Sequence, residues 1–211
     1  MGPDWNTYAP IAREGLGYVA LGAVCSLVSW LAFDAWIIPI AFLAVTLFVV
    51  FFFRNPGRLT PIDPDAIVSP ADGKVMIAEF LPPTAGSPHQ FKIAIFLSIM
   101  NVHINRAPIA GTAKKVIYRP GKFSMAFRTK ESELNERNEI VLEDDYQRRI
   151  TVIQIAGWVA RRIVCYLKEL SYVNCGDRIG LIQFGSRVDL IISGEIEPHI
   201  KVGDTVHGGS T

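Results

Sequence analysis

Two apolar segments without a single charge, separated by only two residues, constrain the fold of this chain more than any other feature. They cover residues 15–33 and 36–53. As helices rising about 1.5 Å per residue, each is long enough to cross the hydrocarbon core of a bilayer. Because only Asp34 and Ala35 connect them, we expect a helical hairpin whose two ends return to the same side of a membrane.

Positive charges flank this predicted hairpin on both sides. Arg13 precedes it, and Arg54 and Arg58 follow it. Positive flanks favour the cytoplasmic side, so we expect a protein of the cell membrane whose remaining residues face the cytoplasm. A signal peptide followed by a buried helix is a weaker alternative, because no AxA-like cleavage site follows the first segment. A re-entrant hairpin that does not cross the bilayer stays open.

The composition changes after residue 54. A stretch rich in Pro, Gly and Asp, NPGRLTPIDPDAIVSPADG, is typical of linkers and turns. We therefore divide the chain into a membrane hairpin, residues 1–54, and a second domain, residues 55–211. A net charge of +1 gives no field that would attract nucleic acid, and the three cysteines lack the spacing of a metal site. We expect neither nucleic acid nor a metal as a partner.

Short β-like runs separated by turn signals fill the second domain. The runs are VMIAEF, FKIAIFLSI, GTAKKVIY, EIVLED, RRITVIQIAG, RIGLIQF, VDLIIS and KVGDTV. This pattern predicts a mainly β (α+β) domain, a β-rich barrel or sandwich with few helices. Residues 159–167, VARRIVCYL, fit a short helix about as well as a strand.

Two stretches of the second domain are similar to each other. SPADGKVMIAEF and PHIKVGDTVHGG both place an Asp/Gly turn beside a short β run. The second stretch resembles the hairpin of biotinyl- and lipoyl-carrier domains, which modify a lysine within an MKM-like triplet. Lys74 and Lys201 lack that triplet. The sequence therefore predicts carrier-like hairpins but argues against a carrier function.

The Gly185–Ser186 pair lies between two apolar β-like runs, in IGLIQFGSRVDLIIS. A surrounding sheet could hold a strained peptide bond, and glycine gives a nucleophile access to its carbonyl group. Two more Gly-Ser pairs, at residues 86–87 and 209–210, lack such flanking runs. On these residues alone, a β-bulge is the alternative to a self-cleavage site.

Six motifs stand in order along the chain: FFFRNPGR, VSPADGKV, LSIMNVHINRAP, NERN, QIAGWVARRIV and FGSRVD. Together they resemble the phosphatidylserine decarboxylase family, in its short form with an N-terminal membrane hairpin. The resemblance runs from residue 51 to residue 206. Several separate motifs in the right order make it far more specific than any one of them.

The resemblance implies a self-processing enzyme. Cleavage before Ser186 would give a β chain, residues 1–185, and an α chain, residues 186–211, and would turn Ser186 into a covalent pyruvoyl group without any metal. This ketone would form a Schiff base with the serine headgroup of phosphatidylserine in the membrane, and the reaction would release CO2 and phosphatidylethanolamine. The two chains would stay associated, and a homo-oligomer stays open.

His103 and Asp72 are the residues expected to act with Ser186. His103 follows the apolar run FKIAIFLSI, and an imidazole transfers protons near neutral pH. Asp72 lies in the PADG turn and could orient that imidazole, as in a catalytic triad. The alternatives are a structural histidine and a plain Asx turn.

Arg106 stands where longer family members carry a second histidine. His103 could therefore serve both self-cleavage and decarboxylation, or Arg106 could bind the substrate carboxylate or phosphate. Lys122 and Arg137 are further candidates for the lipid phosphate, although a solvated position suits each of them equally. The histidines expected at the surface are His89, His199 and His207.

Two rival functions stay open on the sequence alone. A non-enzymatic membrane adaptor with a carrier-like β domain would need no cleavage and no keto group. A pyruvoyl-dependent decarboxylase of a soluble amino acid would keep the serine chemistry but would leave the hairpin unexplained.

Overall fold

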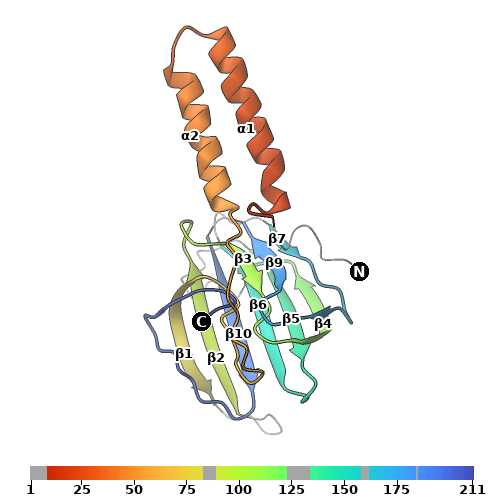
Figure 1. Ribbon diagram of the computed structural model, residues 1–211. Helices are drawn as coiled ribbons and strands as arrows, with labels where there is room; N and C mark the ends of the chain where they lie inside the picture. Colours follow the sequence, from red (N-terminus) through yellow and green to blue (C-terminus); the bar gives the residue numbers. More distant parts are fainter. Residues whose placement is uncertain (1–8, 83–88, 123–133, 158–161, 184) are drawn as a thin grey trace. The chain divides into compact units, whose positions relative to one another are not determined.

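The computed structural model describes residues 9–82, 89–122, 134–157, 162–183 and 185–211. The chain forms two compact units, Met1–Gly57 and Arg58–Thr211. Figure 1 labels both helices and the longer strands.

The first unit contains the predicted helical hairpin, α1 (Arg13–Ala32) and α2 (Ile37–Phe52). Most of its apolar side chains are exposed, which suits lipid better than water. α1 is long and apolar enough to cross a membrane, whereas α2, with 16 residues against 20, is shorter. The bounds of both helices differ from the expected ones by one or two residues.

Close packing and end-to-end contacts hold the hairpin together. A Cβ at Gly22 of α1 would overlap the hydroxyl of Thr46 of α2, so glycine lets the two helices approach. At the open end of the hairpin, the Ala12 N–H donates to the Phe53 carbonyl at 2.8 Å. The two ends therefore lie side by side, as the short connection predicts.

The second unit is built on an eight-stranded antiparallel sheet in the order β11-β1-β2-β10-β6-β5-β4-β8 (Figure 1). Its strands are β1 Gly73–Leu81, β2 Gln90–Leu97, β4 Gly111–Arg119, β5 Arg137–Glu143, β6 Arg149–Ala156, β8 Tyr172–Val173, β10 Ser186–Ser193 and β11 Thr205–Val206. A three-stranded sheet packs against it in the order β3-β9-β7, with strands Ile104–Arg106, Arg178–Ile182 and Ile163–Cys165. The prediction of a mainly β unit is confirmed, and the described strands form a sandwich with an open large sheet.

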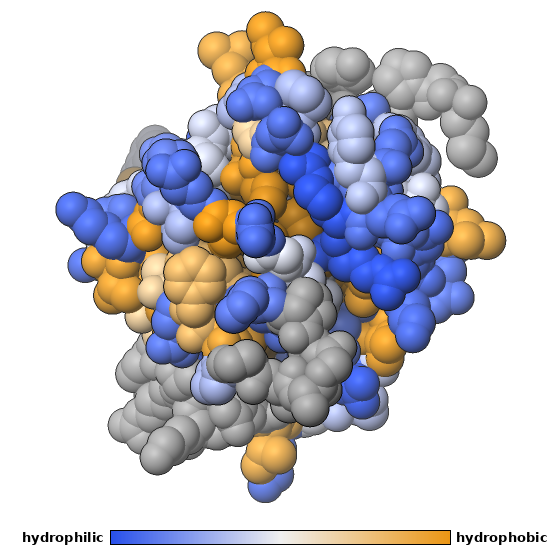
Figure 2. Space-filling view, turned by 90° about the horizontal axis from the view of Figure 1, so that it is seen from below, coloured by the Kyte–Doolittle hydropathy of each residue, from blue (hydrophilic) through white to orange (hydrophobic). Residues whose placement is uncertain are grey.

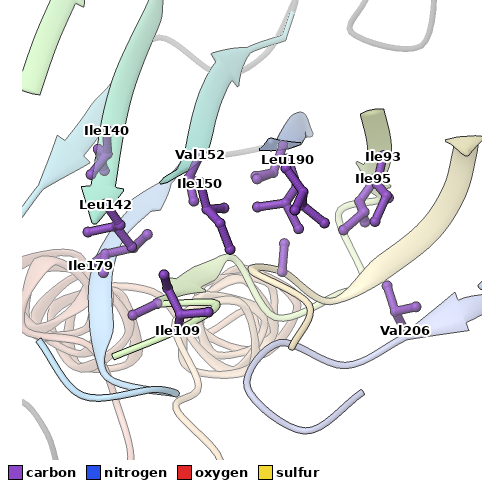
Figure 3. Packing of buried hydrophobic residues seen from close by; sticks show 14 of the residues in the cluster. Ile93, Ile95, Ile109, Ile140, Leu142, Ile150, Val152, Ile179, Leu190 and Val206 are labelled. Atoms are coloured by element: carbon purple, nitrogen blue, oxygen red, sulfur yellow. The ribbon is translucent and has the colours of Figure 1, made fainter. Parts of the chain in front are cut away.

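Alternating apolar residues on the central strands build the core. Every second residue of a strand faces the same side, so Val188, Leu190 and Ile192 of β10 all enter the core. Figure 3 shows Leu190 in a row with side chains of the neighbouring strands, and Ile109 and Val206 facing this row. The large sheet therefore presents one continuous apolar face, and β10 runs through its middle.

Two expectations about local structure are corrected. Within residues 159–167, Ile163–Cys165 form strand β7, which pairs with β9, and the helical alternative is wrong there. Residues 158–161 lie outside the described residues. The run KVGDTV is a strand only at Thr205–Val206, because Gly203 adopts φ +96 in a turn. β3 and β8 are too short for an alternation pattern to predict.

The two similar stretches of the second unit pair with each other. Gly73 of β1 lies opposite Val206 of β11, and the Val75 N–H donates to the Asp204 carbonyl at 2.9 Å. Each stretch thus supplies one strand to a shared edge of the large sheet. The last described residues of the chain are thereby held against the PADG turn.

Candidate functional site

The Gly185–Ser186 pair lies at the start of β10, between β2 and β6. Ser186 is opposite Leu97 on one side and Ala156 on the other, and both pairings continue without a register shift, so β10 contains no β-bulge. Gly185 has φ +65, a left-handed conformation that glycine adopts without strain. A Cβ at Gly185 would meet nothing within 4 Å. Its backbone conformation, rather than lack of space, therefore favours glycine.

The Ser186 side chain lies on the core face of β10, which also carries Val188 and Leu190. Ser186 is fully buried, and its Oγ has no hydrogen-bond partner among the described residues. Buried polar groups in folded proteins nearly always have a partner. Ser186 Oγ is an exception to this rule. It belongs to the residue directly after Gly185, and a nucleophile that attacks the Gly185 carbonyl group would have to be there.

His103 lies directly before β3 and contacts the Gly185–Ser186 pair. Its Nδ1 is 2.9 Å from the Asn101 carbonyl, and the Gly185 N–H donates to its Nε2 at 3.3 Å. A carbonyl only accepts hydrogen bonds, so Nδ1 carries the hydrogen and Nε2 carries the lone pair. His103 is buried, with 2% of its surface exposed. The structure thus places a proton acceptor at the residue pair that the sequence singled out.

Asp72 belongs to a neighbouring cluster. Its carboxylate accepts hydrogen bonds from Arg58 at 2.5 Å and from the Gly208 N–H at 2.8 Å, and it lies 3.4 Å from His207 Nδ1. His103 is not among the described partners of Asp72. The structure therefore brings His103 to the Gly185–Ser186 pair and brings Asp72 to His207 and Gly208. His207 is exposed, as predicted, but its contact with Asp72 was not foreseen.

Arg106 lies in the same cluster as Asp72. It is buried, and its Nη1 donates to the Gly176 carbonyl at 2.9 Å. Burial, and then repulsion by Arg58 and Arg178, lowers the pKa of Arg106 to about 10, although Asp72 and Asp177 oppose this shift. Arg106 is therefore still a cation at neutral pH. A cluster with three guanidinium groups can attract an anionic group such as a carboxylate or a phosphate.

Lys122 and Arg137, the other candidate phosphate ligands, lie at the β4–β5 end of the sheet. Lys122 is exposed, and its backbone N–H donates to the Leu134 carbonyl at 2.8 Å. Arg137 is partly exposed and is opposite Ile155 of β6, which in turn is opposite Arg187 of β10. Neither residue has a described contact with Ser186. The other two histidines expected at the surface, His89 and His199, are exposed.

A row of three buried amide side chains was missed by the sequence reasoning. Asn138 Nδ2 donates to Gln154 Oε1 at 2.9 Å, and Gln154 Nε2 donates to Asn105 Oδ1 at 2.8 Å. The alternation of β6 contained a signal, because Gln154 occupies a core-facing position between Val152 and Ala156. A polar residue at such a position is uncommon in a core and points to a functional or structural network.

A cavity of about 700 Å³ lies at the other end of β10. Apolar side chains of β2 and β10, including Ile93 and Ile192, form its floor, and residues 63–70 and 193–200 form its sides. Figure 2 shows hydrophobic side chains in a hollow that hydrophilic residues surround. Neither Ser186 nor His103 lines this cavity, so it is not the candidate reaction site. Among the described residues, no group of three or more His, Cys, Asp or Glu side chains is arranged to hold a metal ion.

Comparison with known proteins decides the family. The model of the family described as phosphatidylserine decarboxylase matches residues 45–211, which include Ser186, His103 and Asp72. The chain belongs to the phosphatidylserine decarboxylase family. It is therefore an enzyme of this decarboxylase family, and the expected resemblance is confirmed.

Two relatives within the phosphatidylserine decarboxylase family match nearly the whole chain. The phosphatidylserine decarboxylase proenzyme of Desulfotalea psychrophila is 43% identical over 208 residues, which cover 96% of this chain and 94% of the relative. The phosphatidylserine decarboxylase proenzyme of Geotalea uraniireducens is 44% identical over 207 residues, which cover 98% of this chain and 96% of the relative. Both matches extend beyond the residues of the family model into the helical hairpin.

Proposed function

We propose that this chain is a self-processing, pyruvoyl-dependent decarboxylase that converts phosphatidylserine to phosphatidylethanolamine and CO2. Family membership supports the reaction class, and the names of the relatives supply the substrate. The observation that carries the proposal is the 3.3 Å hydrogen bond between the Gly185 N–H and His103 Nε2. It brings a proton acceptor to the residue directly before Ser186, a buried serine whose Oγ lacks a hydrogen-bond partner among the described residues.

The proposed maturation uses only the chain and water. Ser186 Oγ attacks the Gly185 carbonyl carbon while its proton passes to His103 Nε2, and the Gly185–Ser186 peptide becomes an ester. Elimination breaks the Cβ–Oγ bond of Ser186, so the oxygen leaves with the Gly185 carboxylate. Water then adds to the dehydroalanine that is left, ammonia departs, and residue 186 ends as a pyruvoyl group. The products are a β chain, residues 1–185, and an α chain, residues 186–211.

The surroundings of Ser186 fit such a group. Residue 186 would stay buried at the start of β10, hydrogen-bonded between β2 and β6, with His103 beside it. The pairing of β11 with β1 and the Gly208–Asp72 hydrogen bond would keep the α chain attached to the β chain. When present, the pyruvoyl ketone would take the substrate amine as a Schiff base and serve as the electron sink for loss of CO2.

The charged residues around the site have proposed roles in binding. Arg106 supplies a buried positive charge for the substrate carboxylate or phosphate, and Lys122 and Arg137 supply partly or fully exposed charges for the phosphate. We also propose that Asp72 supports His103 within the Asp72–His103–Ser186 group. Because its described partners are Arg58, His207 and Gly208, this support would act through the charge of the cluster.

The hairpin would hold the enzyme at the cytoplasmic face of the cell membrane, where its lipid substrate is present. α1 is long enough to cross the bilayer, and Arg13 and Arg54 flank the hairpin. A cysteine at the exposed position Tyr146, in a chain without other cysteines, tests the orientation. A membrane-impermeant maleimide should label it in inside-out vesicles and not in intact cells. Labelling of intact cells would contradict the cytoplasmic location.

Intact-mass spectrometry of the wild-type chain and of Ser186→Ala tests the proposal. The wild type should give two chains, with a pyruvoyl group at the start of residues 186–211, and Ser186→Ala should give one intact chain. A single intact chain in both would remove the self-processing mechanism and favour the adaptor alternative.

A second assay tests the substrate. The cleaved enzyme should release CO2 from phosphatidylserine in vesicles much faster than from soluble glycerophosphoserine. Equal turnover of the two would contradict a role for the membrane, and turnover of free serine alone would favour a soluble amino-acid substrate.

A further inference from the structure

The hydrogen bonds in the row of buried amides between the two sheets are all donated in the same direction. Asn138 donates to Gln154, and Gln154 donates to Asn105, at 2.9 Å and 2.8 Å. All three side chains are buried, with no more than 2% of their surface exposed. Because the Asn105 Oδ1 accepts the last of these hydrogen bonds, its amide orientation is fixed and its Nδ2 is turned away from Gln154.

The row ends in a donor without an acceptor. Asn105 Nδ2 is buried and has no hydrogen-bond partner among the described residues. Burial of an amide N–H without a partner carries a desolvation penalty, and native proteins keep few such groups. Ser186 Oγ, on the core face of the large sheet, is another buried atom without a hydrogen-bond partner among the described residues.

The strand register places these two orphaned atoms at the same end of the core. Gln154 of β6 is opposite Val188 of β10, and Ala156 is opposite Ser186. Gln154 and Ser186 are therefore diagonal neighbours on one face, a separation of about 7 Å that long side chains can span. On the opposite sheet, His103 contacts Gly185 and Asn105 contacts Gln154, so this part of β3 faces both residues.

A glycine on β9 makes room for the row. Gly180 is opposite Asn105, and a Cβ at Gly180 would first overlap the Val164 carbonyl oxygen of β7 and would also lie 2.8 Å from Gln154 Nε2. A larger residue would therefore disturb both the β7–β9 pairing and the amide that orients Asn105.

We propose that Asn105 is a positioning residue for Ser186 in self-cleavage. The structure does not contain this contact, since Asn105 Nδ2 and Ser186 Oγ both lack a described partner. In the proposed reactive conformation, the Nδ2–H donates to Ser186 Oγ and directs the hydroxyl hydrogen toward His103 Nε2, while Gln154 and Asn138 hold the Asn105 amide in orientation. Asn105 neither gains nor loses a proton, because the hydroxyl proton passes to His103 when Oγ attacks the Gly185 carbonyl carbon. This inference rests on the proposed self-processing function.

The substitution Asn105→Asp tests the role, because it keeps the shape and makes the donor depend on pH. An ionised carboxylate only accepts hydrogen bonds, whereas a protonated carboxyl group can donate one, and burial favours the protonated form. Self-cleavage is followed by intact mass after cell-free synthesis and a chase in buffers from about pH 5.5 to about pH 8.5. At the high end, Asn105→Asp should cleave about tenfold more slowly than the wild type, the effect of losing one hydrogen bond.

The pH dependence of the cleavage rate distinguishes a positioning role of Asn105 from a purely structural one. The difference between Asn105→Asp and the wild type should shrink as the pH falls, since protonation restores the donor. Equal cleavage rates at the high end of the pH range would overturn the proposal, as would a constant deficit at every pH. If Asn105→Asp does not fold, Gln154→Glu replaces it, because this variant removes the donor that fixes Asn105 and should also slow cleavage at high pH.

Controls keep this test independent of the proposed function. Asn174→Asp makes the same chemical change at an exposed position and should cleave like the wild type. If the wild type itself never cleaves, the proposed function fails. If the wild type cleaves and Asn105→Asp matches it throughout, only the role of Asn105 fails.

Discussion

The Gly208 backbone N–H donates a 2.8 Å hydrogen bond to Asp72 Oδ1, and the Gly185–Ser186 bond lies between these two residues in the chain. Cleavage of that bond would turn this contact into one between two polypeptides. The neighbouring β1–β11 pairing crosses the same division. The turn that carries Asp72 is therefore positioned to retain the last residues of the chain after processing.

Asp72→Asn should destabilise the second unit. Arg58, whose side chain is 15% exposed, would lose its ion-pair partner, and loss of one partner of a buried pair costs about 3 kcal/mol. Urea unfolding in a Ser186→Ala background measures this without interference from cleavage. Asp65→Asn is the matched control, because Asp65 is 80% exposed in its pair with Arg148 and should change the stability little. Unchanged stability together with lost cleavage would instead assign Asp72 to direct catalysis.

His103→Ala should slow self-cleavage by a factor of about 10² to 10⁴, the range for loss of a general base. The reason is that His103 Nε2 is the described side-chain acceptor at the Gly185 N–H. Appearance of the α chain in a time course of intact masses gives the rate, and added imidazole should restore part of it. His89→Ala, at an exposed histidine, serves as the control. Cleavage of His103→Ala at the wild-type rate would exclude this role.

Features set by neighbours in the sequence could be predicted. Uninterrupted apolar runs gave α1 and α2, and alternation gave the long strands such as β2 and β10. His103 could be placed at a strand end because it follows the apolar run of β2, whereas its association with Ser186 was expected only from the family resemblance. For the helices, the long strands and this strand end, the deciding residues lie within about one element length, the range over which periodicity is informative.

Features set by long-range pairing could not be predicted. The Asp72–Gly208 contact joins residues 136 positions apart, and no local pattern reports which turn meets which chain segment. The contact between Gln154 and Asn105 depends on how the small sheet packs across the large one. The alternation of β6 contains enough information to place Gln154 at a core-facing position, but it does not identify Asn105 as the partner of Gln154.

Gly185→Ala should lower the stability of the second unit by about 1 kcal/mol, because φ +65 strains a residue with a Cβ. Nothing lies within 4 Å of such a Cβ, so the effect would come from the backbone alone. Denaturant unfolding in a Ser186→Ala background measures it. Gly194→Ala, with φ +117 and equally open surroundings, should behave alike, and Gly57→Ala should not. A neutral Gly185→Ala would show that the chain relaxes into another conformation there.

Cys165 should react slowly with alkylating reagents. Burial raises the pKa of its thiol, although hydrogen bonding with the Leu167 backbone and the Asn138 side chain opposes the shift. Less thiolate is therefore present at a given pH than for an ordinary cysteine. Alkylation by iodoacetamide should therefore need a higher pH in the folded chain than in the unfolded chain. Mass spectrometry of peptides from a chain that keeps only Cys165 measures both. Identical pH profiles for the two states would contradict the effect of burial.

The Arg187–Asp189 ion pair should stabilise β10, the strand that follows the proposed cleavage site. Both residues are buried, and Asp189 accepts two hydrogen bonds of 2.5 Å from Arg187 and lies 3.4 Å from Lys92. Asp189→Asn would leave the Arg187 charge without this carboxylate, at a cost of about 3 kcal/mol.

A double replacement separates the stabilisation by the ion pair from the penalty for leaving a buried charge unpaired. Arg187→Met with Asp189→Leu removes both charges of the pair together and should cost less than Asp189→Asn alone, because the buried guanidinium group leaves with its carboxylate. Lys92 also loses this carboxylate, but its side chain is 24% exposed and can be solvated. Urea unfolding of these two variants and of the unchanged chain, all in a Ser186→Ala background, completes the comparison. Because Arg187 and Asp189 point to the face of β10 opposite Ser186, we expect the cleavage rate of the folded fraction to change less than the stability. A double variant less stable than Asp189→Asn would mean that the ion pair itself, rather than compensation of a buried charge, stabilises β10.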